Sequence, residues 1–152
     1  MDNSAKLTEL GITLPAVAAP VAAYVPAVRT GNQVWTSGQL PFIDGTLPAT
    51  GKVGAEVSAE EAEQLARTSA LNALAAVDAL VGIDKVTRIL KIVGFVSSAE
   101  GFAGQPGVIN GASNLMGEIF GEAGAHARSA VGVSELPLNS PVEIELIVEV
   151  AD

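Results

Sequence analysis

The chain of 152 residues has no cysteine and only one histidine, His126. Without cysteine it can form no disulfide, present no thiolate nucleophile and hold no thiolate-ligated metal. One histidine cannot build a multi-histidine metal site or the two-histidine centre of a conventional ribonuclease. These two absences exclude several large classes of catalytic centre before any motif is considered.

Basic residues are also few. Eight Lys and Arg stand against 17 Asp and Glu, which gives a formal net charge of −9 and a sequence pI of about 4.4. Nucleic-acid binders need clustered positive charge to neutralise phosphates. Here only Lys85, Arg88 and Lys91 lie close together in the sequence. We therefore expect no nucleic-acid partner. A small carboxylate ligand held by one buried arginine is still compatible with this composition.

Charged residues make up 16% of the chain, 49% is hydrophobic and the mean hydropathy is +0.41, which together exclude a disordered chain. The apolar content comes from small residues, with 25 Ala and 16 Gly against six aromatic residues. At this length we expect one domain spanning residues 1–152. The small residues predict close packing of its elements and a core completed by burying surface against other copies.

The first part of the chain is apolar but does not have the pattern of a membrane segment. Residues 10–28 are almost entirely apolar or small, and a spanning helix would be interrupted at Pro15, Pro20 and Pro26. The start of the chain has only Lys6 as a basic residue, unlike a signal peptide. We therefore expect residues 1–20 to form an extended N-terminal segment, with no membrane association and a cytoplasmic location.

A helix beginning after Ser58 is the clearest predicted element. Ser58 and Glu61 have the spacing of a capping box. Apolar residues then recur at i,i+3/i+4 spacing up to Gly82, which is a typical C-terminal stop. A second helix is predicted over residues 108–122, followed by Gly124.

Strand-like runs surround these helices. Residues 24–28 and 33–37 are predicted strands joined by a Gly31-Asn32 turn, and a loop follows with a short strand near Phe42. Three longer strands are predicted over residues 85–98, 127–133 and 142–150.

The predicted order is therefore strand, strand, helix, strand, helix, strand, strand. It indicates an α+β fold in which a mixed sheet carries both helices on one face. The other face of the sheet then has no cover within the chain. An apolar sheet face needs a partner, and a homo-oligomer whose sheets meet is the simplest one.

Arg128 is the strongest candidate for a functional side chain. It lies in a predicted strand of small and apolar residues, where a guanidinium must find an anionic or multi-acceptor partner. Its planar fork suits a carboxylate, which it can hold through two parallel hydrogen bonds. The alternative is a structural salt bridge to Glu143 or Glu145 of the neighbouring strand.

Glu143 and Glu145 share one face of the last strand, where a carboxylate could act as a general base or position a water molecule. The alternative is an ordinary solvated strand face. Ser37 has no visible partners for nucleophilic catalysis, so its hydroxyl is better suited to orienting a ligand. His126 is interpreted as a capping or packing residue after the second helix.

Several runs occur together in a characteristic order. They are Tyr24-Val25-Pro26, Gly31-Asn32, Thr36-Ser37-Gly38-Gln39-Leu40-Pro41, Gly82-Ile83-Asp84-Lys85-Val86, the helix start at Asn110, Ala127-Arg128-Ser129, Leu136-Pro137 and Val142-Glu143-Ile144-Glu145. Each run is weak alone, but the ordered set is specific and covers nearly the whole chain from Tyr24 onward. The set resembles the Rid/YjgF family of small trimeric proteins.

This resemblance implies a chorismate-mutase-like α+β fold, a homotrimer with clefts between subunits, and hydrolysis of reactive 2-imino or enamine acids to 2-keto acids and ammonia. Arg128 matches the arginine that clamps the substrate carboxylate, and Glu143 matches the acid that places or activates water. Tyr24, Ser37 and Gly38 match the cleft wall, and Asn110 matches an asparagine near the substrate. The chemistry implied needs no metal and no cofactor.

The sequence departs from well-studied members at two positions near the arginine: Ala130 stands where a cysteine is common, and His126 where a proline is common. The loop before Asn110 is also somewhat longer, and an extra stretch precedes Tyr24. These features are similar to a longer branch of the family that is often labelled endoribonuclease L-PSP-like. Two alternatives therefore stand beside the deaminase: a trimeric carboxylate-binding or chaperone-like module without turnover, and an endoribonuclease, which the acidic composition disfavours.

Overall fold

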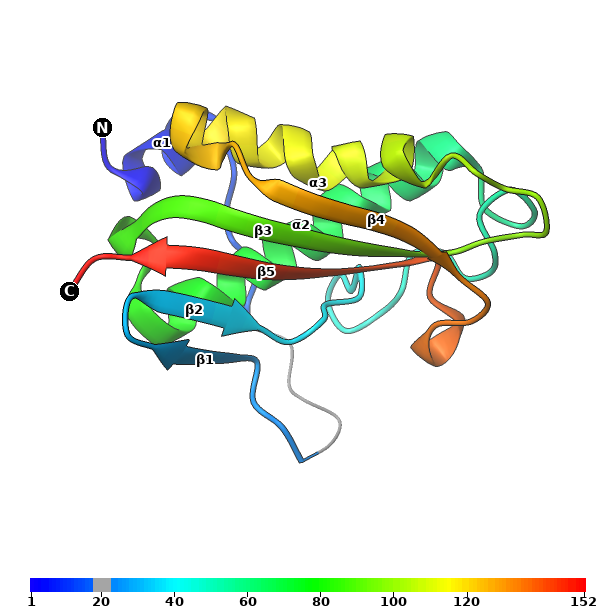
Figure 1. Ribbon diagram of the computed structural model, residues 1–152, viewed down its shortest axis with the longest axis horizontal. Helices are drawn as coiled ribbons and strands as arrows, with labels where there is room; N and C mark the ends of the chain where they lie inside the picture. Colours follow the sequence, from blue (N-terminus) through cyan, green and yellow to red (C-terminus); the bar gives the residue numbers. More distant parts are fainter. Residues whose placement is uncertain (18–22) are drawn as a thin grey trace.

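The computed structural model describes residues 1–17 and 23–152. Pro20, part of the predicted N-terminal segment, lies outside these residues. In chain order the elements are α1 (Asn3–Glu9), β1 (Ala27–Thr30), β2 (Gln33–Thr36), α2 (Ala59–Val81), η1 (Ile83–Lys85), β3 (Val86–Ser97), α3 (Gln105–Phe120), η2 (Gly121–Gly124), β4 (Ala127–Val133), η3 (Pro137–Asn139) and β5 (Val142–Val150) (Figure 1).

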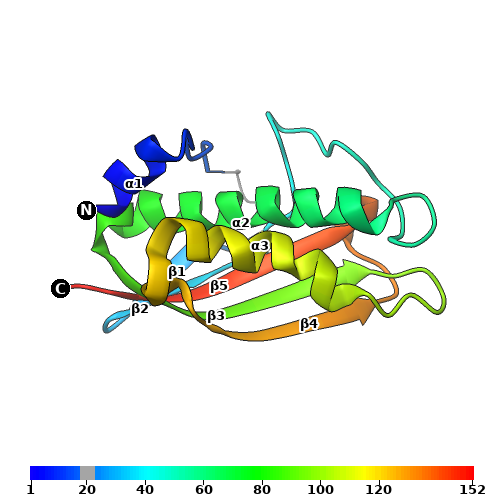
Figure 2. The ribbon, with the colours of Figure 1, turned by 90° about the horizontal axis from the view of Figure 1, so that it is seen from above.

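Five strands form one mixed sheet in the order β1-β2-β5-β3-β4. All neighbouring pairs are antiparallel except β3 and β4, which are parallel and are therefore joined by a crossover helix, α3. Figure 2 shows α2 and α3 side by side on one face of the sheet. The predicted α+β fold, with a mixed sheet and two helices on one face, is confirmed.

Helix α2 begins and ends where the sequence predicts. The Ser58 hydroxyl oxygen accepts a hydrogen bond from the backbone N–H of Glu61 at 3.1 Å, so the serine caps the first turn. Gly82 follows the last turn with a φ of 89°, a conformation that favours glycine. The face of the helix that packs on the sheet consists mostly of alanine and leucine.

Helix α3 begins three residues before the predicted start, at Gln105 instead of residue 108. Pro106 lies in the first turn of this helix, a position that proline fits because the N–H that it lacks has no partner inside the helix there. The helix ends at Phe120, two residues before the predicted end at Glu122, and Gly121 follows it with a φ of 60°.

The prediction that residues 1–20 are extended is wrong for residues 3–9, which form α1. The Asn3 side-chain N–H group donates to the carbonyls of Ile83 and Val86, both at 2.9 Å, and Leu7 is buried. Hydrogen bonds from the backbone and side chain of Ser4 lower the pKa of Asp84. These partners are about 80 positions away along the chain, so local sequence gives little signal for them.

The first hairpin turns at Gly31 as predicted, with a φ of 56°, but β1 begins at Ala27 and not at residue 24. Pro26 cannot donate to a strand ladder, which explains the later start. The strand expected near Phe42 is not a strand: the chain there makes only a bridge between Ile43 and Thr46.

The two faces of the sheet differ sharply along β5. Alternate residues are at most 1% exposed and pack under the helices: Val142, Ile144, Leu146, Val148 and Val150. The other face carries partly or largely exposed apolar side chains, including Val28, Trp35 and Val131, beside Glu143 and Glu145. This open face has no cover within the described residues, as the sequence predicted.

Candidate functional site

The Arg128 side chain points from the edge strand β4 toward α3. Arg128 pairs with Ile92 of β3, which is fully buried under the helices, so both side chains lie on the helix side of the sheet. Arg128 Nη1 donates to Asn110 Oδ1 at 2.8 Å and to Ser113 Oγ at 3.3 Å. The structure thus brings Arg128 and Asn110, both predicted site residues, into contact.

No anion of the described residues pairs with Arg128. The ion pairs among the described residues are Lys6–Glu9, Lys52–Glu135 and Arg67–Glu118, and none of them includes Arg128. The alternative of a salt bridge to Glu143 or Glu145 is wrong within one chain, because β3 separates β4 from β5. Nε and Nη2 of Arg128 make no hydrogen bond to the described residues, so this edge of the guanidinium is available to a ligand carboxylate.

Glu143 lies on the open face of β5 and rests against Gly38. A Cβ built on Gly38 would lie 2.5 Å from Glu143 Oε2, so a larger residue at position 38 would displace the carboxylate. Burial, reinforced by the charge of Glu145, raises the pKa of the Glu143 carboxyl above its usual value near 4.5. A carboxylate with a raised pKa is better suited to take a proton from water.

The raised pKa predicts a pH-dependent effect on stability. A protonated Glu143 favours the folded state, and this contribution is present below the unfolded pKa and is lost as the pH rises through the folded pKa. Glu143→Gln cannot ionise, so we expect its stability relative to wild type to increase between about pH 4 and pH 7. Urea unfolding midpoints of both proteins across this range measure the effect. Glu149→Gln, on the exposed end of the same strand, is the control, and a pH-independent difference for Glu143→Gln contradicts the prediction.

Ser37 precedes Gly38 in the chain, and Tyr24 precedes Val25, to which Ser37 is hydrogen-bonded. The Ser37 hydroxyl donates to the Val25 carbonyl at 2.6 Å, which ties the end of β2 to the segment before β1. The hydroxyl proton is therefore used within the chain, and only the oxygen lone pairs remain for a ligand. Tyr24 is 47% exposed. The roles of both residues stay predictions.

The predicted site residues form two groups on opposite faces of the sheet. Arg128 shares its register row with the buried residues Ile92 and Leu146, whereas Glu143 shares its row with Phe95 and the exposed Val131. Two strand spacings, roughly 10 Å, also separate β4 from β5. One chain therefore cannot bring Arg128 and Glu143 together on one small ligand.

A pocket of about 640 Å³ occurs elsewhere, on the helix side. Its walls include Pro15, Phe42 and Leu71, and none of the predicted site residues lines it. Within the part of the chain that the structure describes, no three acidic or histidine side chains gather as a metal site requires. No helix in that part is both long and apolar enough to cross a membrane.

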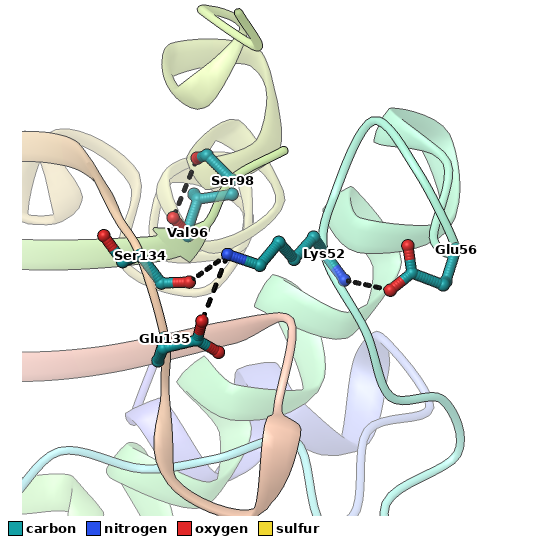
Figure 3. A network of polar contacts seen from close by, with 6 residues as sticks. All are labelled: Lys52, Glu56, Val96, Ser98, Ser134 and Glu135. Atoms are coloured by element: carbon teal, nitrogen blue, oxygen red, sulfur yellow. Dashed lines mark hydrogen bonds and ion pairs between the residues drawn. The ribbon is translucent and has the colours of Figure 1, made fainter. Parts of the chain in front are cut away.

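A polar network fixes the loop before α2 at the far end of the sheet (Figure 3). Lys52 Nζ donates to the carbonyl of Ser134 and forms an ion pair with Glu135 at 3.3 Å, while its backbone N–H donates to Glu56. These contacts join the loop to the connection between β4 and β5. The network contains no predicted site residue.

Sequence reasoning did not place Ser113 and His126 in the site. His126 Nε2 lies 2.9 Å from Ser113 Oγ, which in turn accepts from Arg128. Ser113 lies three residues after Asn110 and therefore on the same face of α3. That spacing was the one signal in the sequence that could have pointed to it.

A family model described as "YjgF/chorismate mutase-like, putative endoribonuclease" matches residues 4–150. The mixed sheet with two helices on one face agrees with this match. The chain belongs to the YjgF/chorismate mutase-like family, also called the Rid family.

Curated relatives cover most of the chain. Protein TCP17 of Trypanosoma cruzi is 44% identical over 96% of this chain and 92% of its own length. The 2-iminobutanoate/2-iminopropanoate deaminase of Escherichia coli K12 is 37% identical over 85% of this chain and 88% of its own length.

Solved structures show the same fold. A crystal structure described as "a putative endoribonuclease" from Shewanella oneidensis has a TM-score of 0.94 and 33% identity, covering 99% of this chain and all of that one. E. coli TdcF with bound serine has a TM-score of 0.66 and 27% identity, covering 91% of this chain and 96% of its own.

Proposed function

We propose that the protein hydrolyses 2-imino acids and their enamine tautomers to 2-keto acids and ammonia. This proposal rests on the hydrogen bonds of Arg128. Its Nη1 donates to two neutral oxygens, and no acidic side chain of the described residues pairs with the guanidinium. Nε and Nη2 make no hydrogen bond to the described residues. A partly buried guanidinium in this state is suited to a ligand carboxylate. The deaminase name of a 37% identical relative supports the same chemistry.

Arg128 acts as the carboxylate clamp, and Asn110 holds the guanidinium in place from α3. TdcF, a structural relative, has been crystallised with serine, a small molecule that carries a carboxylate. Binding the carboxylate fixes the imine carbon relative to the protein, which converts a random encounter with water into attack from one direction.

Glu143 acts on the water molecule. Water adds to the imine carbon while one of its protons passes to the Glu143 carboxylate, and Glu143 then donates that proton to the nitrogen. In the resulting carbinolamine the hydroxyl proton passes through Glu143 to the nitrogen, the C–N bond breaks to release ammonia, and the hydroxyl oxygen becomes the carbonyl oxygen of the keto acid. The reaction changes no oxidation state, and Glu143 ends as a carboxylate.

The site is completed by a second copy of the chain. Because Arg128 and Glu143 lie on opposite faces, the Arg128 edge of one subunit has to meet the Glu143 face of the next. An interface between two different surfaces of the same chain closes into a ring when the rotation permits, and a homotrimer is the ring that we propose. The exposed apolar residues Trp35 and Val131 on the open face provide surface for this contact.

The experiment generates an imine in place from an L-amino acid with an amino-acid oxidase and follows keto acid release. We expect the untagged protein to accelerate release, and Glu143→Gln to reduce kcat by about 100-fold. Glu149→Gln, on the same strand but exposed, is the matched control and is expected to match wild type.

Three outcomes contradict parts of the proposal. Keto acid binding without acceleration favours a carboxylate-binding module without turnover. A larger loss in Glu145→Gln than in Glu143→Gln transfers the role in water activation to Glu145. Full activity of a protein shown to be monomeric contradicts the site between subunits.

A further inference from the structure

The Arg128 guanidinium is the end of a chain of hydrogen bonds that runs through Ser113 and His126. Arg128 Nη1 lies 3.3 Å from Ser113 Oγ, Ser113 Oγ lies 2.9 Å from His126 Nε2, and His126 Nδ1 lies 2.7 Å from the carbonyl oxygen of Gly124. Ser113, His126 and Arg128 are each partly buried. We refer to these three side chains with the Gly124 carbonyl as the relay.

The chemistry of the relay permits one arrangement of hydrogens when His126 is neutral. A carbonyl oxygen only accepts, so His126 Nδ1 carries the proton that faces Gly124. Nε2 then has a lone pair and accepts the Ser113 hydroxyl proton. The lone pairs of Ser113 Oγ that remain accept the N–H of Arg128. Each member of the relay thus fixes the hydrogen-bonding orientation of the next, from the Gly124 carbonyl through His126 and Ser113 to the Arg128 guanidinium.

The backbone of Gly124 packs closely against the backbone of α3. A Cβ built on Gly124 would lie 2.2 Å from the Met116 carbonyl oxygen and 3.1 Å from the Gly117 nitrogen, so only glycine allows this approach. Helix α3 therefore supports the relay at two points: it carries the Ser113 side chain, and it packs against Gly124, whose carbonyl oxygen lies next to His126 Nδ1. The Ser113 hydroxyl lies between two hydrogen-bond partners, His126 Nε2 and Arg128 Nη1.

We propose that His126 and Ser113 are positioning residues for Arg128. By orienting the Ser113 hydroxyl, neutral His126 keeps an acceptor on Nη1, so that the Nε and Nη2 edge stays turned away from α3 and toward the substrate carboxylate. Asn110 provides the second acceptor on the same nitrogen. This inference rests on the proposed role of Arg128 as the carboxylate clamp.

The first test does not depend on activity. His126 is the only histidine, so ¹⁵N spectra of the untagged protein report on this ring alone. At a pH where the ring is neutral, we expect the tautomer protonated at Nδ1, and we expect Ser113→Ala to shift the Nε2 resonance. The Nε2-protonated tautomer in wild type overturns the relay.

The second test measures binding and kinetics in matched variants. Ser113→Ala is expected to raise KM for the imine and Kd for the corresponding keto acid about fivefold each, the effect of one hydrogen bond, with a smaller change in kcat. Ser113→Thr keeps the hydroxyl and is expected to restore both constants. His126→Gln places an amide oxygen near the position of Nε2 and is expected to retain more affinity than His126→Asn, which can reach only the Gly124 carbonyl.

Non-additivity separates positioning from a structural role. In an Arg128→Ala background, Ser113→Ala is expected to change keto acid Kd less than twofold, because the group that it orients is gone. An equal fivefold loss in both backgrounds, or an unchanged Kd in Ser113→Ala alone, overturns the proposal. If wild type binds keto acid but hydrolyses no imine, the deaminase proposal fails while the relay is still tested by Kd. If wild type binds no keto acid, the clamp fails, and the relay as a positioning device fails with it.

Discussion

Arg128→Ala is expected to reduce kcat/KM for 2-imino acids by about 1000-fold, because removing one partner of a desolvated, hydrogen-bonded charge pair leaves the other uncompensated. Arg128→Lys keeps the charge but loses the planar fork, and we expect it to recover only part of the loss. Calorimetric titration with a keto acid should show the same order of affinities: wild type, Lys, Ala. The measurement is steady-state keto acid release with untagged proteins of verified oligomeric state.

Arg67→Ala is the matched control for this experiment. Arg67 lies on α2 and pairs with Glu118 of α3 at 3.0 Å, outside both groups of predicted site residues. Removing it changes the net charge by the same amount, so activity close to wild type is expected. Equal losses in Arg67→Ala and Arg128→Ala would mean that general electrostatics, and not a specific clamp, governs the reaction. An Arg128→Ala protein with wild-type kinetics would remove the basis of the proposed function.

Gly111→Ala is expected to destabilise the protein by about 3 kcal/mol, at the upper end for an added methyl group in a packed core. Gly111 lies on α3 where this helix crosses α2, and a Cβ there would lie 1.9 Å from the carbonyl oxygen of Glu63. The obstacle is backbone, so no side-chain rotation relieves the overlap and the two helices have to move apart. Urea or thermal unfolding of the assembled protein measures the loss.

Gly117→Ala, on the same helix, has the opposite expectation. Nothing lies within 4 Å of a Cβ at this position, so only helix propensity changes, and we expect a gain of up to about 1 kcal/mol. The comparison isolates the close approach of α2 and α3 from the general effect of replacing a helical glycine. If both variants were equally stable, the contact at Gly111 would have room to relax, and the tight packing of α2 on α3 would not be required for stability.

The position of Gly111 also connects stability to the site. Gly111 follows Asn110 and precedes Ser113, the two α3 residues whose oxygens hold Arg128. The close approach of α3 to α2 therefore determines how far the Asn110 and Ser113 side-chain oxygens lie from β4. We expect a stable Gly111 variant, if one can be selected, to bind keto acids more weakly than wild type.

Much of the fold could be predicted from local patterns. The capping serine and alanine-rich face of α2, the β-branched run of β3 and the alternation of β5 each occur within one element, where periodicity and local hydrogen bonds are visible in the sequence. The errors fall where distant residues decide the outcome. Asn3 and Ser4 form a helix against residues about 80 positions away, and α3 begins at Gln105, three residues before the predicted start.

The candidate site shows the same division. Residue types and their order along the chain were enough to select Arg128, Glu143 and Asn110 and to indicate the family. They could not show that Arg128 and Glu143 face opposite sides of the sheet, because β3 lies between their strands and strand order is a property of the assembled sheet. Nor could they show that, among the described residues, Arg128 is held by neutral oxygens 15 and 18 positions away and by no acid. The chemistry of a side chain follows from its residue type, whereas its partners depend on which elements the crossover through α3 places side by side.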